Sequence, residues 1–314
     1  MEPEEVDRAF GMPAGKLRGR AGIESLCYVA EGENEITLAA LAARQALAVA
    51  RCTGEEVDWV LATSETHVGY PSLAAGLHRE LGLRENCGAL AVGGACLGLL
   101  HALAVAQSFL QGGQARTIVV VSADVHSRTL TPGRMAGEFG GLFGDGASAF
   151  VVRGVTADSR IEEYRLGNLV FECVSQYAEA ICVRDAEDGK LEVRFDGEAL
   201  SRPVITRMER VLGTVEAKSG IPRTEVGAFA THQPNPRLVT LLAKQCGVAV
   251  ELFPAVARVS GNLGSSTCGV ALAKALEGAR GEVCSKRKPI FLASLGPGLL
   301  FGGGWLFAES LRSP

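Results

Sequence analysis

Short β-branched runs alternate with apolar helical runs along this chain, and this alternation limits the folds open to it. The run ARTIVVVSADV at 115–125 is continuous and β-branched, which is typical of a buried strand in a parallel sheet. The run EITLAALAARQALAVA at 35–50 repeats apolar residues every three or four positions, which predicts an amphipathic helix. Strands and helices that alternate in this way imply an α/β architecture with helices on both faces of the sheets.

The same patterns predict further elements in both halves of the chain. In the first half we expect a strand at 57–66, a helix at 71–83 that stops at Gly82, a short buried strand at 87–92, a buried helix at 96–113 and a turn into a strand at 144–154. In the second half we expect a strand at 226–233, helices at 236–248 and 264–279, and closing strands at 288–296 and 299–309. Each half has a strand, a bend of small residues and an apolar helix, which indicates a duplicated unit.

Composition and charge exclude several classes of function. The chain has 314 residues and a net charge of −4, so no global charge attracts nucleic acid or an anionic membrane. No apolar run reaches the ~18 residues that a membrane span needs. The first ten residues, MEPEEVDRAF, lack the apolar core of a signal peptide. We therefore expect a cytoplasmic protein that binds neither nucleic acid nor a membrane.

One of the nine cysteines lies in a distinctive setting. In VGGACLGLLHALA (92–104), Cys96 follows a predicted strand and begins an apolar helix, where free backbone N–H groups and the helix dipole stabilise a thiolate. Gly93 and Gly94 allow a sharp bend like that of a nucleophile elbow. The segment alone leaves a nucleophile and a buried structural cysteine equally open. Because the chain has no CxxC pair, the other eight are expected to be reduced, buried, small side chains: Cys27, Cys52, Cys87, Cys173, Cys182, Cys246, Cys268 and Cys284.

The histidines differ in their sequence context. His101 lies about 140° around the helix from Cys96 and is expected to pack elsewhere. For His67, His78 and His126 we expect surface or structural roles. His232, in ATHQPNPRLV, directly follows an apolar strand, at the end where open α/β sheets place their sites.

Asn262 opens another buried helix, in the segment RVSGNLGSSTCGVALA. Taken alone, this asparagine is better explained as a helix N-cap than as a functional residue.

Four motifs together resemble a known family. GGACLGLLHAL, FGDGASAFVV, THQPNPRLV and SGNLGSSTCGVALAKAL resemble, in this order, the β-ketoacyl-acyl-carrier-protein synthase III branch of the thiolase superfamily. The resemblance covers almost the whole chain and extends to GRAGIES (19–25) and THVGYPS (66–72). It implies a thiolase-like duplicated five-layer αβαβα fold, with mixed central sheets and buried helices. The half at 1–155 would carry the cysteine, and the half at 156–314 the histidine and asparagine.

The resemblance also implies a role for each of three residues. Cys96 would be the acyl-accepting nucleophile, since a thiolate both attacks a thioester and leaves well. His232 and Asn262 would bind the carbonyl of the second thioester and donate to the enolate that decarboxylation of a malonyl group produces. The Cys96 N–H would form part of a second oxyanion hole. Because an asparagine cannot act as a base, this set fits decarboxylative condensation; an acyltransferase acting on a hydroxyl or an amine is the alternative.

The closing loop and the N-terminal region depart from the family pattern. The segment GPGL looks like that of chalcone-synthase-type polyketide synthases, and because Pro297 has no N–H, Gly296 or Gly298 would supply any oxyanion contact. The tryptophan that stacks on the coenzyme A adenine is absent from 13–20, although Arg20 is retained. A carrier protein is therefore a plausible acyl donor. The family also begins with a strand about 20 residues upstream of EEVDRAF, so either the start of this chain is misassigned and that strand is missing, or the chain is this short and its first sheet has lost a strand.

The remaining expectations concern partners. Arg237, with Arg202 and Lys244, forms either a basic patch for an acidic acyl-carrier protein or an ordinary solvated helix face. Tyr70 matches the position at which the family inserts a residue across its dimer interface, so the resemblance implies a homodimer. We expect no cofactor and no metal, with acyl-coenzyme A or acyl-carrier protein and a malonyl thioester as substrates. A dinucleotide site at GPGLLFGGG is disfavoured because these glycines lie between two strands.

Overall fold

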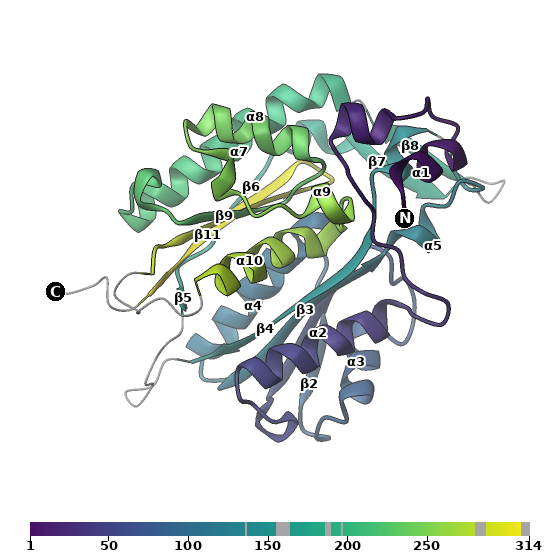
Figure 1. Ribbon diagram of the computed structural model, residues 1–314. Helices are drawn as coiled ribbons and strands as arrows, with labels where there is room; N and C mark the ends of the chain where they lie inside the picture. The colour runs from purple at the N-terminus through teal and green to yellow at the C-terminus, as the bar shows by residue number, and fades with distance from the viewer. Residues whose placement is uncertain (136, 155–163, 186–189, 196, 280–286, 309–314) are drawn as a thin grey trace.

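Helices and sheets alternate through the computed structural model of the chain, which describes residues 1–135, 137–154, 164–185, 190–195, 197–279 and 287–308. Two sheets lie one above the other with helices outside and between them (Figure 1).

The first sheet is built from the N-terminal half. Its order is β2 (Gly88–Ala91), β1 (Trp59–Thr63), β3 (Thr117–Val125) and β4 (Asp145–Arg153). The first three strands are parallel, and β4 runs antiparallel to β3. Helices α2 (Glu35–Val49) and α3 (Leu73–Leu81) cover its outer face. Because side chains pack on both faces of the sheet, every residue of β3 is buried.

The second sheet comes mainly from the C-terminal half. Strand β9 (Ala228–Thr231) is parallel to β10 (Ile290–Gly296), which pairs antiparallel with β11 (Leu300–Ala308). The far side of β11 pairs with the short strands β5 (Tyr164–Leu166) and β6 (Val170–Cys173). Helices α7 (Gly197–Ser219) and α8 (Pro236–Cys246) cover the outer face.

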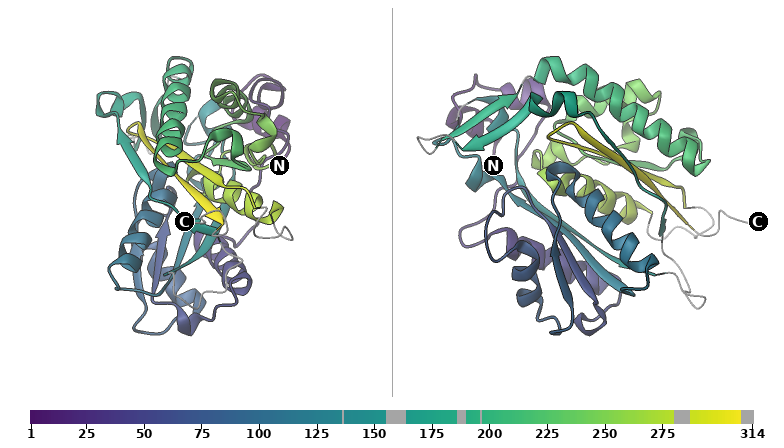
Figure 2. Two further views of the ribbon diagram at one scale, coloured as in Figure 1. Left: turned by 90° about the vertical axis from the view of Figure 1, so that its left-hand side faces the viewer. Right: turned by 180° about the vertical axis from the view of Figure 1, so that it is seen from behind.

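Two apolar helices fill the space between the sheets, as the rear view in Figure 2 shows. Helices α4 (Gly98–Gln111) and α10 (Thr267–Gly278) share one hydrophobic core with both sheets. Leu99 and Leu272 of these helices belong to the same buried cluster as Val120 of β3. The layers are thus helix, sheet, helix, sheet, helix, which confirms the predicted five-layer fold.

Short elements complete the described chain. They are α1 (Pro3–Ala9), the π-helix η1 (Leu17–Ala21), α5 (His126–Thr129), α6 (Glu138–Gly141), α9 (Ala257–Ser260), the strand pair β7 (Ile181–Asp185) and β8 (Leu191–Phe195), and the 3₁₀ turns η2 (Gly54–Glu56), η3 (Ala95–Leu97), η4 (Ser175–Ala180), η5 (Arg223–Glu225), η6 (Val250–Leu252) and η7 (Gly264–Ser266).

The structure confirms the predicted helices and strands but corrects two statements about burial. The strand at 87–92 was expected to be buried, yet β2 is an exposed edge strand because it pairs only with β1. Cys27 and Cys173 are exposed and Cys182 is half-buried, so the expectation of burial is wrong for these three.

Several other expectations have simpler outcomes. The cysteines at 52, 87, 246 and 268 are buried as expected, and Cys284 lies outside the described residues. The boundary drawn at position 155 also lies outside them, so the division into halves stays a prediction. Within the described chain, no helix is both long and apolar enough to cross a membrane.

Candidate active site

The turns that begin the two central helices meet beside the carboxyl ends of three strands. Turn η3, at the start of α4, contacts both β10 and turn η7 at the start of α10. Turn η7 also contacts β3. Helix α4 contacts β1 and helix α10 contacts β9, so side chains distant in sequence come together near the two turns.

The Cys96 bend is sterically determined. Gly94 has a φ of 136° and Ala95 a φ of 46°, a left-handed conformation that is uncommon for alanine. A Cβ at Gly94 would lie 2.3 Å from Nδ1 of His101, and that nitrogen lies 3.0 Å from the Gly93 carbonyl oxygen. Only glycine fits at position 94, so the sharp bend that the two glycines predict is present, and His101 packs against it. Cys96 itself is 8% exposed.

Strand β10 holds the cysteine and the histidine at adjacent positions. The Ser294 hydroxyl donates to the Cys96 carbonyl oxygen at 2.7 Å. The backbone N–H of His232 donates to the Ala293 carbonyl oxygen at 2.9 Å. Because Ala293 and Ser294 are consecutive, one strand fixes the backbone of both residues.

Of the two candidate oxyanion glycines, one closely approaches the Cys96 bend. A Cβ at Gly296 would lie 3.1 Å from the Gly94 carbonyl oxygen and 3.4 Å from the Leu97 backbone nitrogen. Gly298 lies in the turn after β10, with a φ of 81° and no comparable approach. The oxyanion role of both glycines stays a prediction.

Asn262 has a fixed amide orientation. Its Oδ1 accepts hydrogen bonds from the Gly264 N–H at 3.0 Å and from the Thr267 hydroxyl at 3.2 Å. A backbone N–H can only donate, so the atom that faces it must be the amide oxygen. Nδ2 is therefore the group left to donate. The N-cap of α10 is Ser266, so the interpretation of Asn262 as the cap of this helix is wrong.

His232 is a neutral imidazole in this setting. It is 4% exposed, and this burial lowers its pKa to about 4. Its Nδ1 is buried and has no hydrogen-bond partner among the described residues. At neutral pH the ring therefore acts as a hydrogen-bond donor or acceptor without positive charge.

A buried acid–base cluster that the sequence analysis did not identify adjoins Cys96. Oε2 of Glu65 lies 3.6 Å from Nε2 of His126. The carboxylate of Asp124 accepts from the Glu65 N–H at 2.5 Å with one oxygen and from the Ser265 hydroxyl at 2.6 Å with the other. The cluster thus joins the ends of β1 and β3 to η7.

The cluster changes the expected state of the nucleophile. Burial, followed by the negative charges of Glu65 and Asp124, raises the pKa of the Cys96 thiol well above its usual range. The backbone at the helix start acts in the opposite direction but more weakly. The expectation of a stabilised resting thiolate is therefore wrong: the thiol is protonated at neutral pH.

Within the cluster, pairing outweighs burial for two groups. Burial alone would lower the pKa of His126, but contact with Glu65 raises it. Burial alone would raise the pKa of Glu65, but contact with His126 lowers it. Burial raises the pKa of Asp124 to about 6. His126, expected on the surface or in a structural role, is 3% exposed and paired with Glu65, so the surface expectation is wrong.

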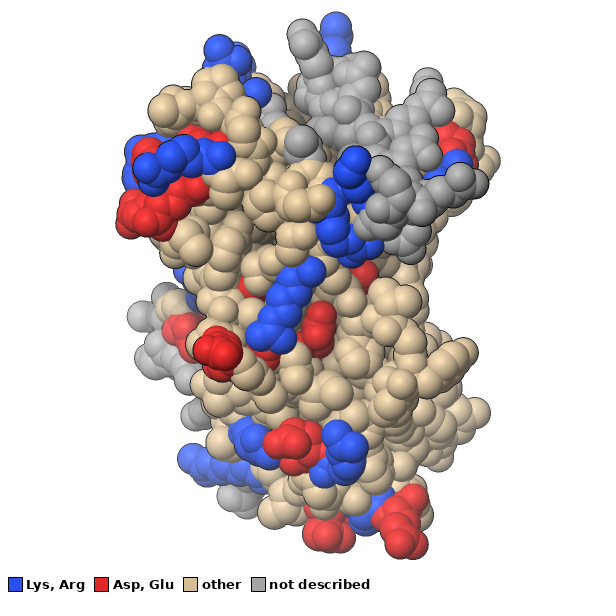
Figure 3. Space-filling model, turned by 90° about the vertical axis from the view of Figure 1, so that its right-hand side faces the viewer, with Lys and Arg blue, Asp and Glu red and all other residues tan. Residues whose placement is uncertain are grey.

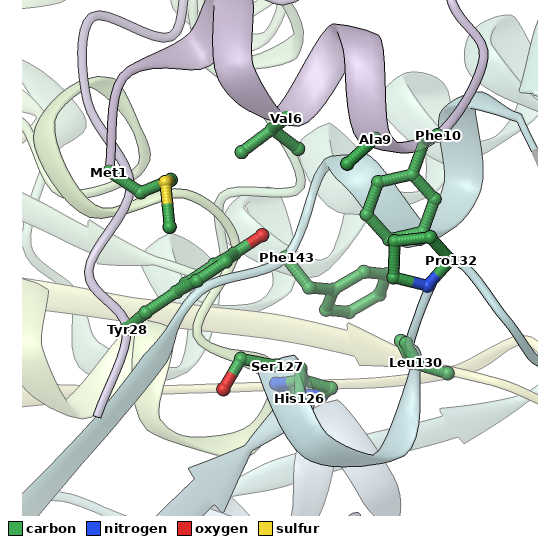
Figure 4. Close-up of a pocket in the computed structure, with 11 residues that line it drawn as sticks. Met1, Val6, Ala9, Phe10, Tyr28, His126, Ser127, Leu130, Pro132 and Phe143 are labelled. Atoms are coloured by element: carbon green, nitrogen blue, oxygen red, sulfur yellow. The ribbon is translucent and has the colours of Figure 1, made fainter. Parts of the chain in front are cut away.

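A small apolar cavity of about 80 Å³ is lined in part by His126 of the cluster. Figure 4 shows His126 facing the cavity from one side, with Val6 and Ala9 of α1 on the opposite side. Phe10 and Phe143 supply aromatic surface between them. The remaining residues around it are Met1, Tyr28, Ser127, Leu130, Pro132 and Gly140.

The predicted binding residues lie on the surface. Arg20, Arg202, Arg237 and Lys244 are exposed, and Arg237 and Lys244 lie two turns apart on one face of α8. A Cβ at Gly22 would lie 3.3 Å from Pro236, which places the η1 segment that carries Arg20 beside the start of α8. Arg202 lies on α7, which packs against α8.

The surface around the N-terminal elements carries mixed charge. Figure 3 shows Lys and Arg interspersed with Asp and Glu on the face that carries α1 and α5. Tyr70 and its neighbour Val68 are fully or almost fully exposed, at 102% and 89%. Among the described residues, no group of three or more His, Cys, Asp or Glu side chains is arranged to hold a metal ion.

Comparison with known proteins agrees with this geometry. Residues 91–169 match the family model of 3-oxoacyl-[acyl-carrier-protein] synthase III, and residues 217–306 match the model of its C-terminal part. Together the two segments cover more than half of the chain. The chain belongs to the 3-oxoacyl-[acyl-carrier-protein] synthase III family. It is therefore a condensing enzyme of the transferase class, as the motifs predicted; the likeness of its GPG loop to polyketide synthases stays a prediction.

Related proteins match over nearly the full chain. The β-ketoacyl-[acyl-carrier-protein] synthase III of Dinoroseobacter shibae is 30% identical over 295 residues, covering 91% of this chain and 88% of that protein. The enzyme of Ruegeria pomeroyi is 28% identical with the same coverage. The structure of the Aquifex aeolicus synthase III has a TM-score of 0.85 at 24% identity, covering 98% of this chain and 95% of its own. A structure of Xanthomonas campestris OleA has a TM-score of 0.86 at 20% identity, covering 98% and 94%.

Proposed function

We propose that this enzyme loads an acyl group on Cys96 and condenses it with a decarboxylated malonyl thioester to give a β-ketoacyl thioester. The observation that carries the proposal is the state of the two N–H donors. Asn262 has its Oδ1 committed to Gly264 and Thr267, and His232 is uncharged. Both are therefore available as neutral donors to a thioester oxygen.

The reaction has two stages. In the first, the Cys96 sulfur attacks an acyl thioester, and the donor thiol leaves. In the second, the malonyl thioester loses CO2, and the resulting enolate attacks the acyl carbonyl on Cys96. His232 and Asn262 hydrogen-bond the enolate oxygen more strongly as its negative charge develops, which lowers the barrier to decarboxylation.

The alternative is acyl transfer from Cys96 to a hydroxyl or an amine without C–C bond formation. The two reactions differ in CO2 release, so the test supplies acyl donor and carboxyl-labelled malonyl thioester and measures labelled CO2 together with the product mass. Stoichiometric CO2 and β-ketoacyl product support condensation. Acyl transfer without CO2, in the presence of an added amine or alcohol, would replace the proposal with the alternative.

The acyl carrier that this account favours is an acidic acyl-carrier protein. Arg237 and Lys244 present two exposed positive charges on one face of α8, next to the segment of Arg20. A double charge reversal, Arg237→Glu with Lys244→Glu, should raise the KM for acyl-carrier protein several-fold and leave the KM for acyl-coenzyme A nearly unchanged. Charge reversal at exposed Arg79 on α3 is the control. If the α8 double reversal and the Arg79 reversal change the KM for acyl-carrier protein equally, α8 is not the docking face.

We also propose that the enzyme is a homodimer, with β2 at the interface. Strand β2 has one unpaired edge in the described chain and exposes Leu90, which leaves a strand edge that another copy can pair. The fully exposed Tyr70 lies in the loop between β1 and α3. A second copy would cover both features.

A further inference from the structure

Glu65 is a buried carboxylate beside the nucleophile, and the proposed reaction gives it no task. Its Oε1 is buried without a hydrogen-bond partner among the described residues, while Oε2 faces His126. Burying a carboxylate oxygen without a partner costs free energy, so such a group is unusual unless it has a function. The Glu65 carboxylate also interacts directly with the Cys96 thiol.

The backbone holds Glu65 and Cys96 together. A Cβ at Gly98 would lie 2.0 Å from the Thr63 hydroxyl oxygen, so the end of β1 touches the start of α4. Glu65 comes two residues after Thr63, and Cys96 two residues before Gly98. The Glu65 N–H donates to Asp124, which fixes the position of the glutamate backbone.

Gly264 packs closely against the Glu65 carboxylate and leaves no space for a side chain at its own position. A Cβ at Gly264 would lie 2.9 Å from Oε1 of Glu65 and 2.5 Å from Cε1 of His126. Gly264 also donates its N–H to Asn262. The Oε1 atom of Glu65 therefore lies close to Gly264, the residue whose N–H donates to Asn262.

Acyl transfer to Cys96 requires a proton to move. The thiol is protonated, so its attack on a thioester must release a proton, and the departing thiolate must gain one. Asn262 has no basic group, and His232 is a weak base with a pKa of about 4. Both Asp124 oxygens already accept hydrogen bonds, from Glu65 and Ser265. Glu65 is the remaining group that contacts the thiol.

We propose that Glu65 is a catalytic acid–base that carries the Cys96 thiol proton during acyl transfer. As the sulfur forms its bond to the acyl carbon, the proton moves from Sγ to the Glu65 carboxylate. When the tetrahedral intermediate collapses, the bond from carbon to the donor sulfur breaks, and Glu65 returns the proton to that sulfur. The products are acyl-Cys96 and a neutral donor thiol, and Glu65 is again ionised. This inference rests on the proposed acylation of Cys96.

The test compares Glu65→Gln with wild type by two measurements. General acid–base catalysis contributes roughly 100-fold or more, so acyl-enzyme formation, followed by intact mass after rapid mixing with an acyl thioester, should slow by about that factor. Alkylation of Cys96 by iodoacetamide should instead become faster at a given pH near 8. The variant lacks the negative charge that disfavours the thiolate, and iodide needs no proton to leave. A purely structural role would slow both reactions.

Glu80→Gln is the matched control, because it makes the same change on an exposed residue of α3 that pairs with Arg44. If Glu65→Gln forms the acyl-enzyme at the wild-type rate, the inference is overturned. An equal fall in the rates of acylation and alkylation would overturn it as well. An unfolded variant is recognised by circular dichroism, and Glu65→Asp, which keeps the charge, then serves in its place with partial loss of the acylation rate expected. If wild type forms no acyl adduct with any donor, the proposed function fails instead.

Discussion

Nε2 of His126 lies 3.6 Å from Oε2 of Glu65, and the same histidine lines the apolar cavity beside α1. The pair is buried, and its two members stabilise each other's charge. Through this contact His126 favours the ionised form of Glu65, the carboxylate that interacts with the Cys96 thiol. It is a positioning residue for Glu65.

This relationship predicts the pH dependence of acylation. Glu65 must be ionised to accept the thiol proton, and His126 lowers its pKa. Replacing the cation by His126→Gln should raise the Glu65 pKa and shift the acid limb of the acylation rate to higher pH. Asp124, with a pKa of about 6, titrates in the same cluster, and buried His232 and Cys96 also face Glu65.

The measurement is the acylation rate from about pH 3 to about pH 9 for both proteins, a range that spans the ordinary pKa values of carboxylates and histidine. A simple fall in rate at every pH, without movement of the acid limb, would contradict the charge-positioning role of His126.

The asparagine should separate the two stages of the reaction. Asn262→Ala removes one donor to the enolate oxygen, so decarboxylation should slow by roughly 100-fold while acylation of Cys96 keeps its rate. Labelled CO2 release measures the decarboxylation, and intact mass measures the acyl-enzyme. If a folded variant loses both acylation and decarboxylation, Asn262 maintains the geometry of the site and is not a specific donor to the enolate.

The bend before Cys96 should tolerate a side chain at one glycine and not at its neighbour. A Cβ at Gly94 would lie 2.3 Å from the His101 ring and would require a φ of 136°, whereas a Cβ at Gly93 meets nothing within 4 Å. Gly94→Ala should therefore lower the free energy of unfolding by about 2 kcal/mol or more and reduce acylation. Gly93→Ala should stay near wild type. Urea unfolding checks both, and equal stabilities would refute this account of the bend.

How much the sequence predicts depends on whether the determining interactions are local. Cys96, His232 and Asn262 are recognisable because each lies in a short motif with glycines, prolines or an adjacent apolar strand. Glu65 and His126 have no such motif. Each follows a strand as an ordinary polar residue, and only the convergence of β1, β3 and η7 buries them together.

The errors on burial and protonation have the same origin. The sequence of β2 is apolar, but its exposure depends on its place at the edge of the sheet. The helix start beside Cys96 predicts a thiolate, yet burial and two carboxylates from distant segments outweigh it. The exposure of β2 and the protonation of Cys96 both depend on contacts between distant segments, which the local sequence pattern does not predict.

The edge strand gives a test of assembly. Leu90→Lys places a charge on the exposed face of β2. In a symmetric dimer both protomers carry the substitution, so two lysines would be buried at one interface. The dissociation constant of the dimer should rise by roughly 100-fold. Leu41→Lys, on an exposed position of α2, is the control, since Leu41 is 55% exposed. Sedimentation velocity over a concentration series reports the outcome, and a dimer unaffected by Leu90→Lys would place the interface elsewhere.

The central claim is that Cys96 carries the acyl group, and the intact mass of the protein tests it most directly. Wild type and Cys96→Ala are each incubated with acyl-coenzyme A and with acyl-carrier protein, then quenched in acid. We predict a mass increase of one acyl group on wild type, mapped to Cys96 by peptide analysis, and no increase on Cys96→Ala. An adduct that persists in Cys96→Ala, or no adduct on wild type with either donor, would contradict the account.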